Sequence, residues 1–283
     1  MHAKGVSLGY WSQPYLIDIV SSKTEGKWFL DYVRDKYFGG KPAKAALSLG
    51  CGNGEIDRIA YGKRIFASVH GVDFSAGGLE IAHAEAQKAG IPACYSRVDL
   101  NHEPIPGDER YDLVYDYASS HHISNLDNVM ASVESHLAPD GFFVLYGYCG
   151  PARMQWSPRV LELSNALMRR IPMRLRSSLP EVRRPTAWEF QSDPSEAVRG
   201  RDVIDFMRAY FDVVEEIDIG LSLSHGMFAH NAHLLNPHNE SEQAIFRLVC
   251  QYEELLMSEG IIESDTKVMI CKRRASDPLR PGG

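Results

Sequence analysis

A glycine-rich turn between a strand-like segment and a helix-like one restricts the fold of this chain more than any other feature. The segment ALSLGCGNGEID places Gly50, Gly52 and Gly54 directly after an apolar run. Glycine allows a tight turn and a close approach of the backbone to a ligand, and the first turn of the following helix offers free N–H groups. We therefore expect a nucleotide-type ligand beside this turn, in contact also with Cys51 and Asn53.

Alternating strand and helix patterns extend to about residue 150. Expected strands cover 45–49, 69–72, 94–98, 111–115 and 142–146, and expected helices cover 77–89 and 126–137. Strands that alternate with helices of this length indicate a parallel sheet with helices on both faces. Right-handed crossovers place the strand ends along one edge, where ligands of such sheets bind.

The pattern changes after Gly150. The next 50 residues are partly helical, rich in arginine and proline and without a clear strand, whereas 211–219 and 266–272 alternate like strands. An aromatic helix is also expected over 24–38, capped by Thr24. We expect one compact domain made of an N-terminal helical lid, a ligand-binding core, an arginine-rich helical insertion and a completion of the sheet with an inserted helix. Their bounds are 1–43, 44–150, 151–200 and 201–283.

Composition restricts the partners. The formal net charge of −7 argues against a nucleic-acid binder with a broad basic surface. No run of 18 apolar residues is present, and the first 30 residues are too polar for a signal peptide, so we expect no membrane association. The five cysteines are scattered without CxxC spacing, as free thiols in a reducing compartment would be. These features predict a cytoplasmic protein.

Acidic residues follow the second and third expected strands. Asp73 lies about 20 residues after the glycine turn, where a carboxylate can bind ribose hydroxyls, and Asp99 is placed to accept from an adenine amino group. Either residue alone could instead be a loop carboxylate or a helix cap. A dinucleotide fingerprint needs a small residue at position 55, which is Glu55 here, so the pattern disfavours an NAD(P)-dependent oxidoreductase.

The segments ALSLGCGNGEID, HGVDFS, SRVDLN and YDLVYDYASSHHI resemble, in order and spacing, the successive motifs of class I methyltransferases that use S-adenosylmethionine (SAM). The resemblance covers about residues 45–150. It implies an α/β fold, a Rossmann-like doubly wound sheet of seven strands, mostly parallel with an antiparallel last strand, plus helical N-terminal and acceptor-side insertions.

The resemblance also implies a cofactor site for SAM, with S-adenosylhomocysteine as the product. The glycine turn would border the methionine part of SAM. Asp73 would bind the ribose, and Phe74 would lie against the adenine. Asp99 with Leu100 would fix the edge of the adenine, and Tyr117 with Ala118 would run beside the sulfonium.

The acceptor is less restricted. The segments YGYCGPARMQW and DPSEAVRG resemble, more loosely, a subgroup of methyltransferases from glycan and natural-product pathways. We therefore expect methyl transfer to a small-molecule acceptor, with an anionic or phosphate-bearing acceptor as one form of this hypothesis. In-line displacement at a cationic sulfur mainly requires positioning and a dry pocket.

His121 and His122 follow the fourth strand, where many family members face the acceptor. An imidazole near its free pKa can accept a hydroxyl proton at neutral pH, so both are candidate catalytic bases. The alternative is a structural pair that bonds loop carbonyls. Candidate acceptor-binding residues are Tyr10, Trp11, Tyr148, Arg153, Trp156, Glu196 and Arg199.

Each acceptor candidate has a simpler interpretation. The aromatic residues near the N-terminus are typical of packing, Glu196 and Arg199 could pair with each other, and the arginines of the insertion could form a solvated face. Guanidinium groups also match phosphate and carboxylate, which keeps the anionic acceptor open.

We expect no metal site. The histidines of the C-terminal half match no zinc spacing, and the carboxylate cluster of a magnesium-dependent catechol-type transferase is not recognised. A methyltransferase-like binding protein without activity remains an alternative. The choice between oxygen, nitrogen and carbon acceptors is open, as is a homodimer.

Overall fold

The computed structural model of the chain describes residues 10–274 and divides into two compact units. The sheet unit comprises Phe29–Cys149, Ser195–Ile217 and the chain from Lys267. The helical unit comprises the chain up to Trp28, Gly150–Pro194 and Asp218–Thr266. The four-segment division expected from the sequence stays a prediction.

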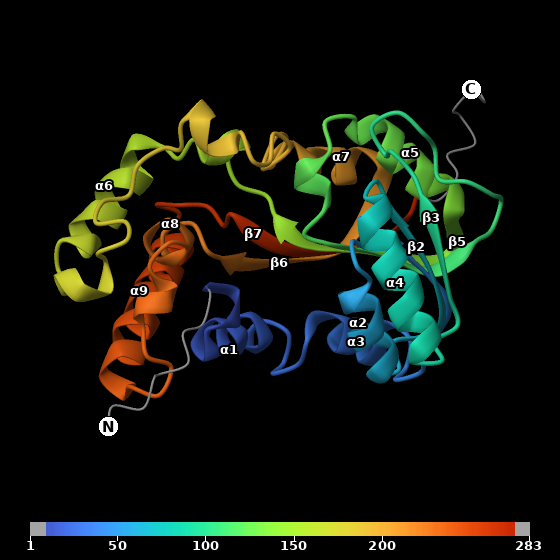
Figure 1. Cartoon of the computed structure of the whole chain (residues 1–283), viewed down its shortest axis with the longest axis horizontal. Coiled ribbons are helices and arrows are strands. Elements are labelled where there is room, and N and C mark those ends of the chain that lie inside the picture. Colours follow the sequence, from blue (N-terminus) through green and yellow to red (C-terminus); the bar gives the residue numbers. More distant parts are fainter. Residues whose placement is uncertain (1–9, 275–283) are drawn as a thin grey trace. The chain divides into compact units, whose positions relative to one another are not determined.

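A seven-stranded sheet is the frame of the sheet unit (Figure 1). In spatial order its strands are β3 (Ala93–Arg97), β2 (Phe66–Asp73), β1 (Ala43–Leu49), β4 (Tyr111–Tyr117), β5 (Leu137–Tyr148), β7 (Thr266–Arg273) and β6 (Phe211–Gly220). The first five pair in parallel. Strand order reverses between β1 and β4, so their carboxyl ends mark the switch point where ligands bind. The predicted Rossmann-like, mostly parallel sheet with an antiparallel last strand is confirmed.

Apolar side chains on one face of the sheet pack against two helices, α5 (Leu126–His136) and α7 (Asp202–Tyr210). Leu47 and Val114 from the central strands share a buried cluster with Val129 of α5 and Met207 of α7. Burial of a side chain of this size contributes about 1.5–3 kcal/mol. The crossover helices after β1 and β2 are α3 (Glu55–Gly62) and α4 (Ala76–Lys88).

Two expected elements start five residues away from their expected positions, whereas the bounds of the other strands differ by three residues or fewer. The helix expected from Thr24 begins at Phe29, as α2 (Phe29–Tyr37), because the chain before it turns through the left-handed conformations of Glu25 (φ +57°) and Gly26 (φ +74°). Thr24 donates to the Lys27 carbonyl at 2.6 Å within that turn. The fifth strand is longer than expected, because β5 starts where α5 ends.

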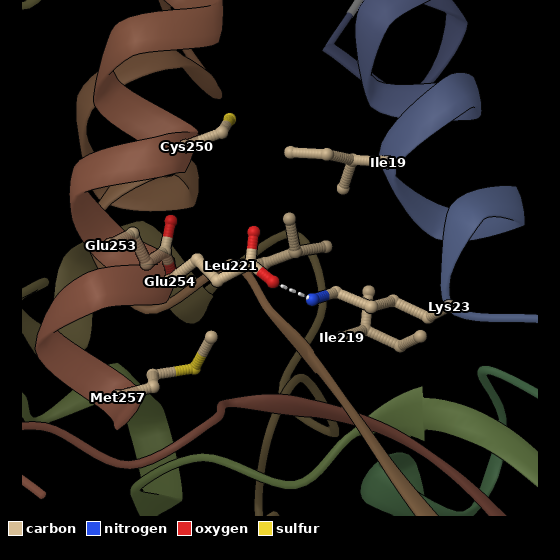
Figure 2. A pocket seen from close by; sticks show the side chains of 8 residues that line it. All are labelled: Ile19, Lys23, Ile219, Leu221, Cys250, Glu253, Glu254 and Met257. Atoms are coloured by element: carbon tan, nitrogen blue, oxygen red, sulfur yellow. Dashed lines mark hydrogen bonds and ion pairs between the residues drawn. The ribbon is translucent and has the colours of Figure 1, made fainter. Parts of the chain in front are cut away.

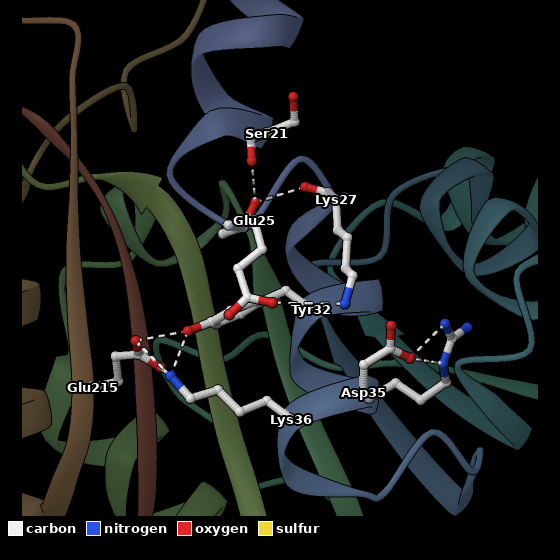
Figure 3. A network of polar contacts seen from close by, with 9 residues as sticks. Ser21, Glu25, Lys27, Tyr32, Asp35, Lys36 and Glu215 are labelled. Carbon is white, nitrogen blue, oxygen red and sulfur yellow. Dashed lines mark hydrogen bonds and ion pairs between the residues drawn. The ribbon is translucent and has the colours of Figure 1, made fainter.

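A polar network holds α2 against β6 within the sheet unit (Figure 3). Tyr32 donates to Glu215 at 2.8 Å, Lys36 reaches both Glu215 oxygens at 3.0 Å, and Tyr37 donates to the same carboxylate at 2.5 Å. Burial alone would raise the pKa of Glu215, but these hydrogen bonds outweigh it and hold that pKa below its usual value. The network therefore fixes α2, the first helix of the sheet unit, to strand β6.

The helical unit contains α1 (Pro14–Ser22), α6 (Pro158–Met168), α8 (Ser224–Phe228) and α9 (Glu240–Ser258), with short 3-10 turns at Tyr10–Ser12, Ala152–Met154, Met173–Leu175, Ala187–Phe190 and Ala232–Leu234. Asn239 caps α9 by accepting from the Glu242 N–H at 3.2 Å. Among residues 10–274, no helix is long and apolar enough to cross a bilayer.

Glu253 is a buried carboxylate of α9 beside a small cavity of about 10 Å³ (Figure 2). It accepts from the backbone N–H groups of Ser222, Leu223 and Ser224, which lie at the start of α8. Burial raises the pKa of Glu253 although these bonds oppose the shift. Glu253 therefore caps α8 and is part of the packing of the helical unit.

Candidate functional site

The glycine turn lies at the carboxyl end of β1, as expected. Gly50, Gly52 and Gly54 have φ of +58°, +54° and +68°, a conformation that other residues adopt at a cost. The Gly52 N–H donates to Asp73 Oδ2 at 2.8 Å, and Asp73 Oδ1 accepts from the Ser75 N–H at 2.7 Å. The ends of β1 and β2 are thus joined through the carboxylate that the sequence singled out.

Two of these glycines lack room for a side chain. A Cβ on Gly50 would overlap the Ser119 side chain, which follows β4. A Cβ on Gly54 would lie 2.9 Å from Ala82 Cβ of α4, whereas a Cβ on Gly52 would meet open space. Of the three glycines, only Gly52 therefore has room for a side chain, although it is half-buried like Gly50.

The sequence reasoning missed a buried carboxyl group beneath the turn. Asp57, in the first turn of α3, is fully buried and accepts from Ser48 at 2.8 Å and from the Tyr115 hydroxyl at 2.6 Å. Burial raises the pKa of Asp57, although the hydroxyls of Tyr115 and Ser48 oppose the shift. The only sequence signal was an acid three residues after the last glycine, which is also common at a helix start.

The remaining predicted cofactor residues lie at the ends of β2, β3 and β4. Phe74 is 61% exposed, and the Arg97 guanidinium lies 5.3 Å from its ring centre. Asp99 accepts from the Asn101 N–H at 3.0 Å and pairs with His102 at 2.8 Å, and the hydrogen bond from His102 lowers the pKa of Asp99. The Leu100 side chain is buried in the core.

Tyr117 ends β4 and packs on the Tyr146 ring, with the ring centres 5.2 Å apart. The next residue, Ala118, has φ +57° and donates its N–H to the Tyr146 carbonyl at 2.7 Å. The chain therefore turns sharply out of β4 just where the predicted path past the cofactor begins.

A short 3-10 turn, Ser120–His122, carries the two candidate histidines. Asp116 is fully buried beneath it and accepts from Ser119 N at 2.8 Å, from Ser119 Oγ at 2.7 Å and from Ser120 N at 2.9 Å, as well as from the Ser120 hydroxyl. Burial raises the pKa of Asp116 despite these bonds. One carboxyl group thus shapes the turn that presents His121 and His122.

Glu196 faces both histidines. Its carboxylate oxygens lie 3.6 Å from His121 Nε2 and 3.7 Å from His122 Nε2. Tyr148, at the end of β5, packs edge-on against His121 with the ring centres 5.9 Å apart. Glu196 does not pair with Arg199 as one interpretation held, since Arg199 bonds Asp202 at 2.5 Å.

Arg199 has an anchoring position. Its guanidinium donates to the Ser124 carbonyl at 3.1 Å and lies 5.4 Å from the Phe206 ring centre. The segment that carries Glu196 is thereby tied to the loop after the histidine turn.

The other candidates lie in the helical unit. Tyr10 is 4% exposed and stacks on His225, with the ring centres 5.3 Å apart. The Trp156 indole N–H donates to Asp265 at 3.0 Å, and Trp156 lines a cavity of about 60 Å³ together with His225. Arg153 has φ +54° and lies over the Phe190 ring. The side chain of Trp11 lies outside the described part of the structure.

Several arginines of the insertion are engaged within the helical unit. Arg183 forms a bidentate pair with Glu189 at 2.7 and 3.0 Å, and Arg174 pairs with Glu242 at 2.6 Å. Arg184 donates to the Trp156 carbonyl at 2.8 Å. Local pairing therefore accounts for much of the arginine enrichment that the sequence shows.

Comparison with known proteins identifies a family and a fold that this chain resembles. Residues 47–143 match a family model described as a methyltransferase domain. A ubiquinone biosynthesis O-methyltransferase from Glaesserella parasuis serovar 5 (strain SH0165) is 27% identical over 120 residues, which cover 41% of this chain and 50% of that protein. The matched region thus spans half the length of this curated relative.

Two solved structures share the fold over most of the chain. A geranyl diphosphate C-methyltransferase from Streptomyces coelicolor A3(2), in complex with Mg²⁺, geranyl diphosphate and S-adenosyl-L-homocysteine, has a TM-score of 0.52 and 13% identity, covering 87% of this chain and 80% of that one. The [4+2]-cyclase SpnF has a TM-score of 0.50 and 16% identity, covering 96% and 89%. At such identities the likeness describes the fold.

Proposed function

We propose that this chain, a member of the class I SAM-dependent methyltransferases, transfers a methyl group from SAM to a small-molecule acceptor and releases S-adenosylhomocysteine. The observation that carries the proposal is the bond from Gly52 N to Asp73 Oδ2, at 2.8 Å. It joins the one glycine of the turn that has open space beside its Cα to the acid of the next strand, and Asp99 follows the end of the strand beyond.

The cofactor half of the proposal follows the strand ends. The methionine part of SAM would lie along the glycine turn, where Gly52 has open space above its Cα. Asp73 would accept from the ribose hydroxyls, and the exposed Phe74 ring would lie against the adenine. Asp99, whose pKa is lowered by His102, stays ionised at neutral pH and can accept from the adenine amino group.

The transfer is an in-line displacement. A lone pair of the acceptor attacks the methyl carbon, the carbon–sulfur bond breaks, and its electron pair stays on the sulfur. An acceptor hydroxyl must also lose its proton, and His121 and His122 are the proposed acceptors of that proton. Tyr148, Glu196 and Arg199 are the acceptor-side candidates of the sheet unit, and Arg153 and Trp156 stay candidates in the helical unit.

A protein of this fold that does not transfer methyl groups is the second candidate, and the similarity to a [4+2]-cyclase favours keeping it. A SAM-binding cyclase would bind the cofactor without consuming it. Incubation with SAM and a panel of neutral and anionic hydroxyl-bearing metabolites separates the two, because a transferase produces S-adenosylhomocysteine in an acceptor-dependent way.

Calorimetry tests the cofactor site itself. The full chain should bind SAM and S-adenosylhomocysteine, and Asp73→Ala should weaken SAM binding by about 1–3 kcal/mol because ribose hydroxyls lose their acceptor. Asp108→Ala, an exposed acid of the same unit, is the matched control and should bind normally. Tight NAD binding without SAM binding would disprove the proposal, and unchanged SAM affinity in Asp73→Ala would show that the ribose lies elsewhere.

A further inference from the structure

We infer that His121, His122 and Glu196 form a binding site for one divalent transition-metal ion. Each offers a donor atom, and the three atoms all lie within 4.8 Å of one another. Among the described residues, no other group of three His, Cys, Asp or Glu side chains converges in this way. The inference departs from the expectation of no metal site, which rested on the spacing of the C-terminal histidines and on the missing carboxylate cluster of a magnesium-dependent transferase.

The distances suit an ion better than direct hydrogen bonds. The oxygens of Glu196 lie 3.6 and 3.7 Å from the two Nε2 atoms, beyond hydrogen-bonding range. Metal bonds of about 2.0–2.2 Å separate neighbouring ligand atoms by roughly 3.0–3.5 Å around a tetrahedral or octahedral centre. Small side-chain rotations would therefore bring all three donors onto one ion.

Neighbouring residues hold the three proposed metal ligands in position. His122 Nδ1 lies 3.1 Å from Ser195 Oγ, so the second ring nitrogen has a partner while Nε2 faces Glu196. Such outer partners fix the tautomer and orientation of metal-binding histidines. The turn before the histidines is fixed by buried Asp116, and Arg199 anchors the segment after Glu196 through Ser124.

The donor set indicates the class of metal. Two imidazoles with one carboxylate suit Fe²⁺, Mn²⁺, Co²⁺ or Zn²⁺, whereas Mg²⁺ and Ca²⁺ prefer oxygen ligands alone. Three protein ligands also leave coordination positions open. His121 is nearly buried, but His122 and Glu196 are partly exposed, so a further ligand can reach the ion.

The role of the ion rests on the proposed function. Ser119, two residues before His121, packs against Gly50 of the glycine turn, so the site adjoins the proposed cofactor position. We assign the acceptor an oxygen nucleophile that coordinates the ion. With the ion bound, His121 and His122 would act as its ligands in place of their proposed role as bases. Coordination would lower the pKa of the acceptor hydroxyl, its proton would pass to a solvent base, and the oxygen lone pair would attack the methyl carbon while the carbon–sulfur pair stays on sulfur.

Metal binding is tested without SAM or acceptor. The chelator-treated full chain is titrated with Zn²⁺ and with Co²⁺, followed by calorimetry and by the visible absorption of Co²⁺. One ion per chain is expected, and Glu196→Gln and His122→Ala should each weaken binding about 100-fold or more. Ser195→Ala should weaken it about tenfold, since only the outer partner is lost.

Matched controls keep the test decisive. His83→Ala and Glu80→Gln remove an exposed histidine and an exposed acid on α4 and should bind the ion normally. Circular dichroism confirms the fold of each variant. Absence of a stoichiometric site in the wild-type chain, or unchanged affinity in both Glu196→Gln and His122→Ala, overturns the metal site.

The two proposals fail separately. A chain that binds Zn²⁺ but not SAM refutes the proposed function and leaves the metal site standing. A chain that transfers methyl groups at full rate after metal removal, with turnover lost in the histidine variants, refutes the role of the ion and supports an imidazole base. Restoration of turnover by added Co²⁺ or Mn²⁺ supports that role.

Discussion

The loops after β1 and β4 show two ways to hold a backbone in an unusual shape at the same sheet edge. The strands are neighbours, with Leu49 opposite Asp116 in the register. The glycine turn after β1 is shaped by residues that tolerate positive φ. The loop after β4 contains no glycine: after a positive φ at Ala118, one buried carboxyl group binds the N–H and hydroxyl groups of the histidine turn.

The two turns suit different tasks: one offers backbone N–H groups to a ligand, and the other positions particular side chains. A turn made of glycine brings backbone N–H groups close to a ligand of any kind. A turn fixed by Asp116 presents two particular side chains, His121 and His122, in one orientation. The first suits a cofactor that many proteins share, and the second suits a chemical step that depends on particular residues.

The largest expected effect breaks the histidine turn. Asp116→Ala leaves the donors of Ser119 and Ser120 without their buried acceptor, and we expect a loss of about 3–4 kcal/mol in the free energy of unfolding. Asp116→Asn can replace one oxygen only and should lose roughly half as much. Urea denaturation measures both, with Asp108→Ala as the control. A loss below about 1 kcal/mol in Asp116→Ala would show that the turn is held by other contacts.

The next effect compares two glycines of the same turn. Gly50→Ala combines a positive φ with overlap against Ser119 and should cost about 2–3 kcal/mol. Gly52→Ala meets only the conformational penalty, about 1–2 kcal/mol, because its Cβ would enter open space. The order of the two by thermal or urea unfolding is the prediction. A larger loss in Gly52→Ala than in Gly50→Ala would contradict the prediction, and would mean that Ser119 moves aside while the space beside Gly52 is filled.

SAM affinity should follow the opposite order. A Cβ on Gly52 points into the space assigned to the cofactor, so Gly52→Ala should weaken SAM binding more than its small effect on stability suggests. Calorimetry on both alanine variants makes the comparison. Equal SAM affinities would remove Gly52 from the proposed cofactor surface.

The glycine turn after β1 is easier to predict from the sequence than the histidine turn after β4. The glycine turn, Asp73 and Asp99 are recognisable because glycines and strand-end acids recur at regular spacing along the chain. Glu196 lies more than 70 residues after His121, and no local pattern relates the two. Asp57 was missed as a structural acid because its partner Tyr115 comes close only when the strands are paired. Asp116 was missed although its partners Ser119 and Ser120 follow it directly in the chain, because an acid at the end of a strand shows no sign of burial in the sequence.

The smallest expected effect comes from replacing the buried acid Asp57, with Asp116 as the comparison. Asp57 accepts hydrogen bonds from two hydroxyl groups, and burial raises its pKa. Between the unfolded and the folded pKa, the folded chain therefore binds more protons than the unfolded chain. The stability of the wild-type chain therefore falls as the pH rises from the unfolded pKa of Asp57 through its folded pKa. Asp57→Asn has no such proton, and its amide oxygen still accepts.

We expect Asp57→Asn to change stability by less than about 1 kcal/mol, and its stability relative to the wild type should rise as the pH passes from the unfolded pKa of Asp57 to its raised folded pKa. Urea denaturation across this range measures the difference. Asp116→Asn is the informative comparison, because four donors converge on Asp116 and an amide cannot serve them all. If both asparagine variants behaved alike, the two loops would be held by equivalent acids, and the contrast between a backbone-shaped and a side-chain-shaped turn would not hold.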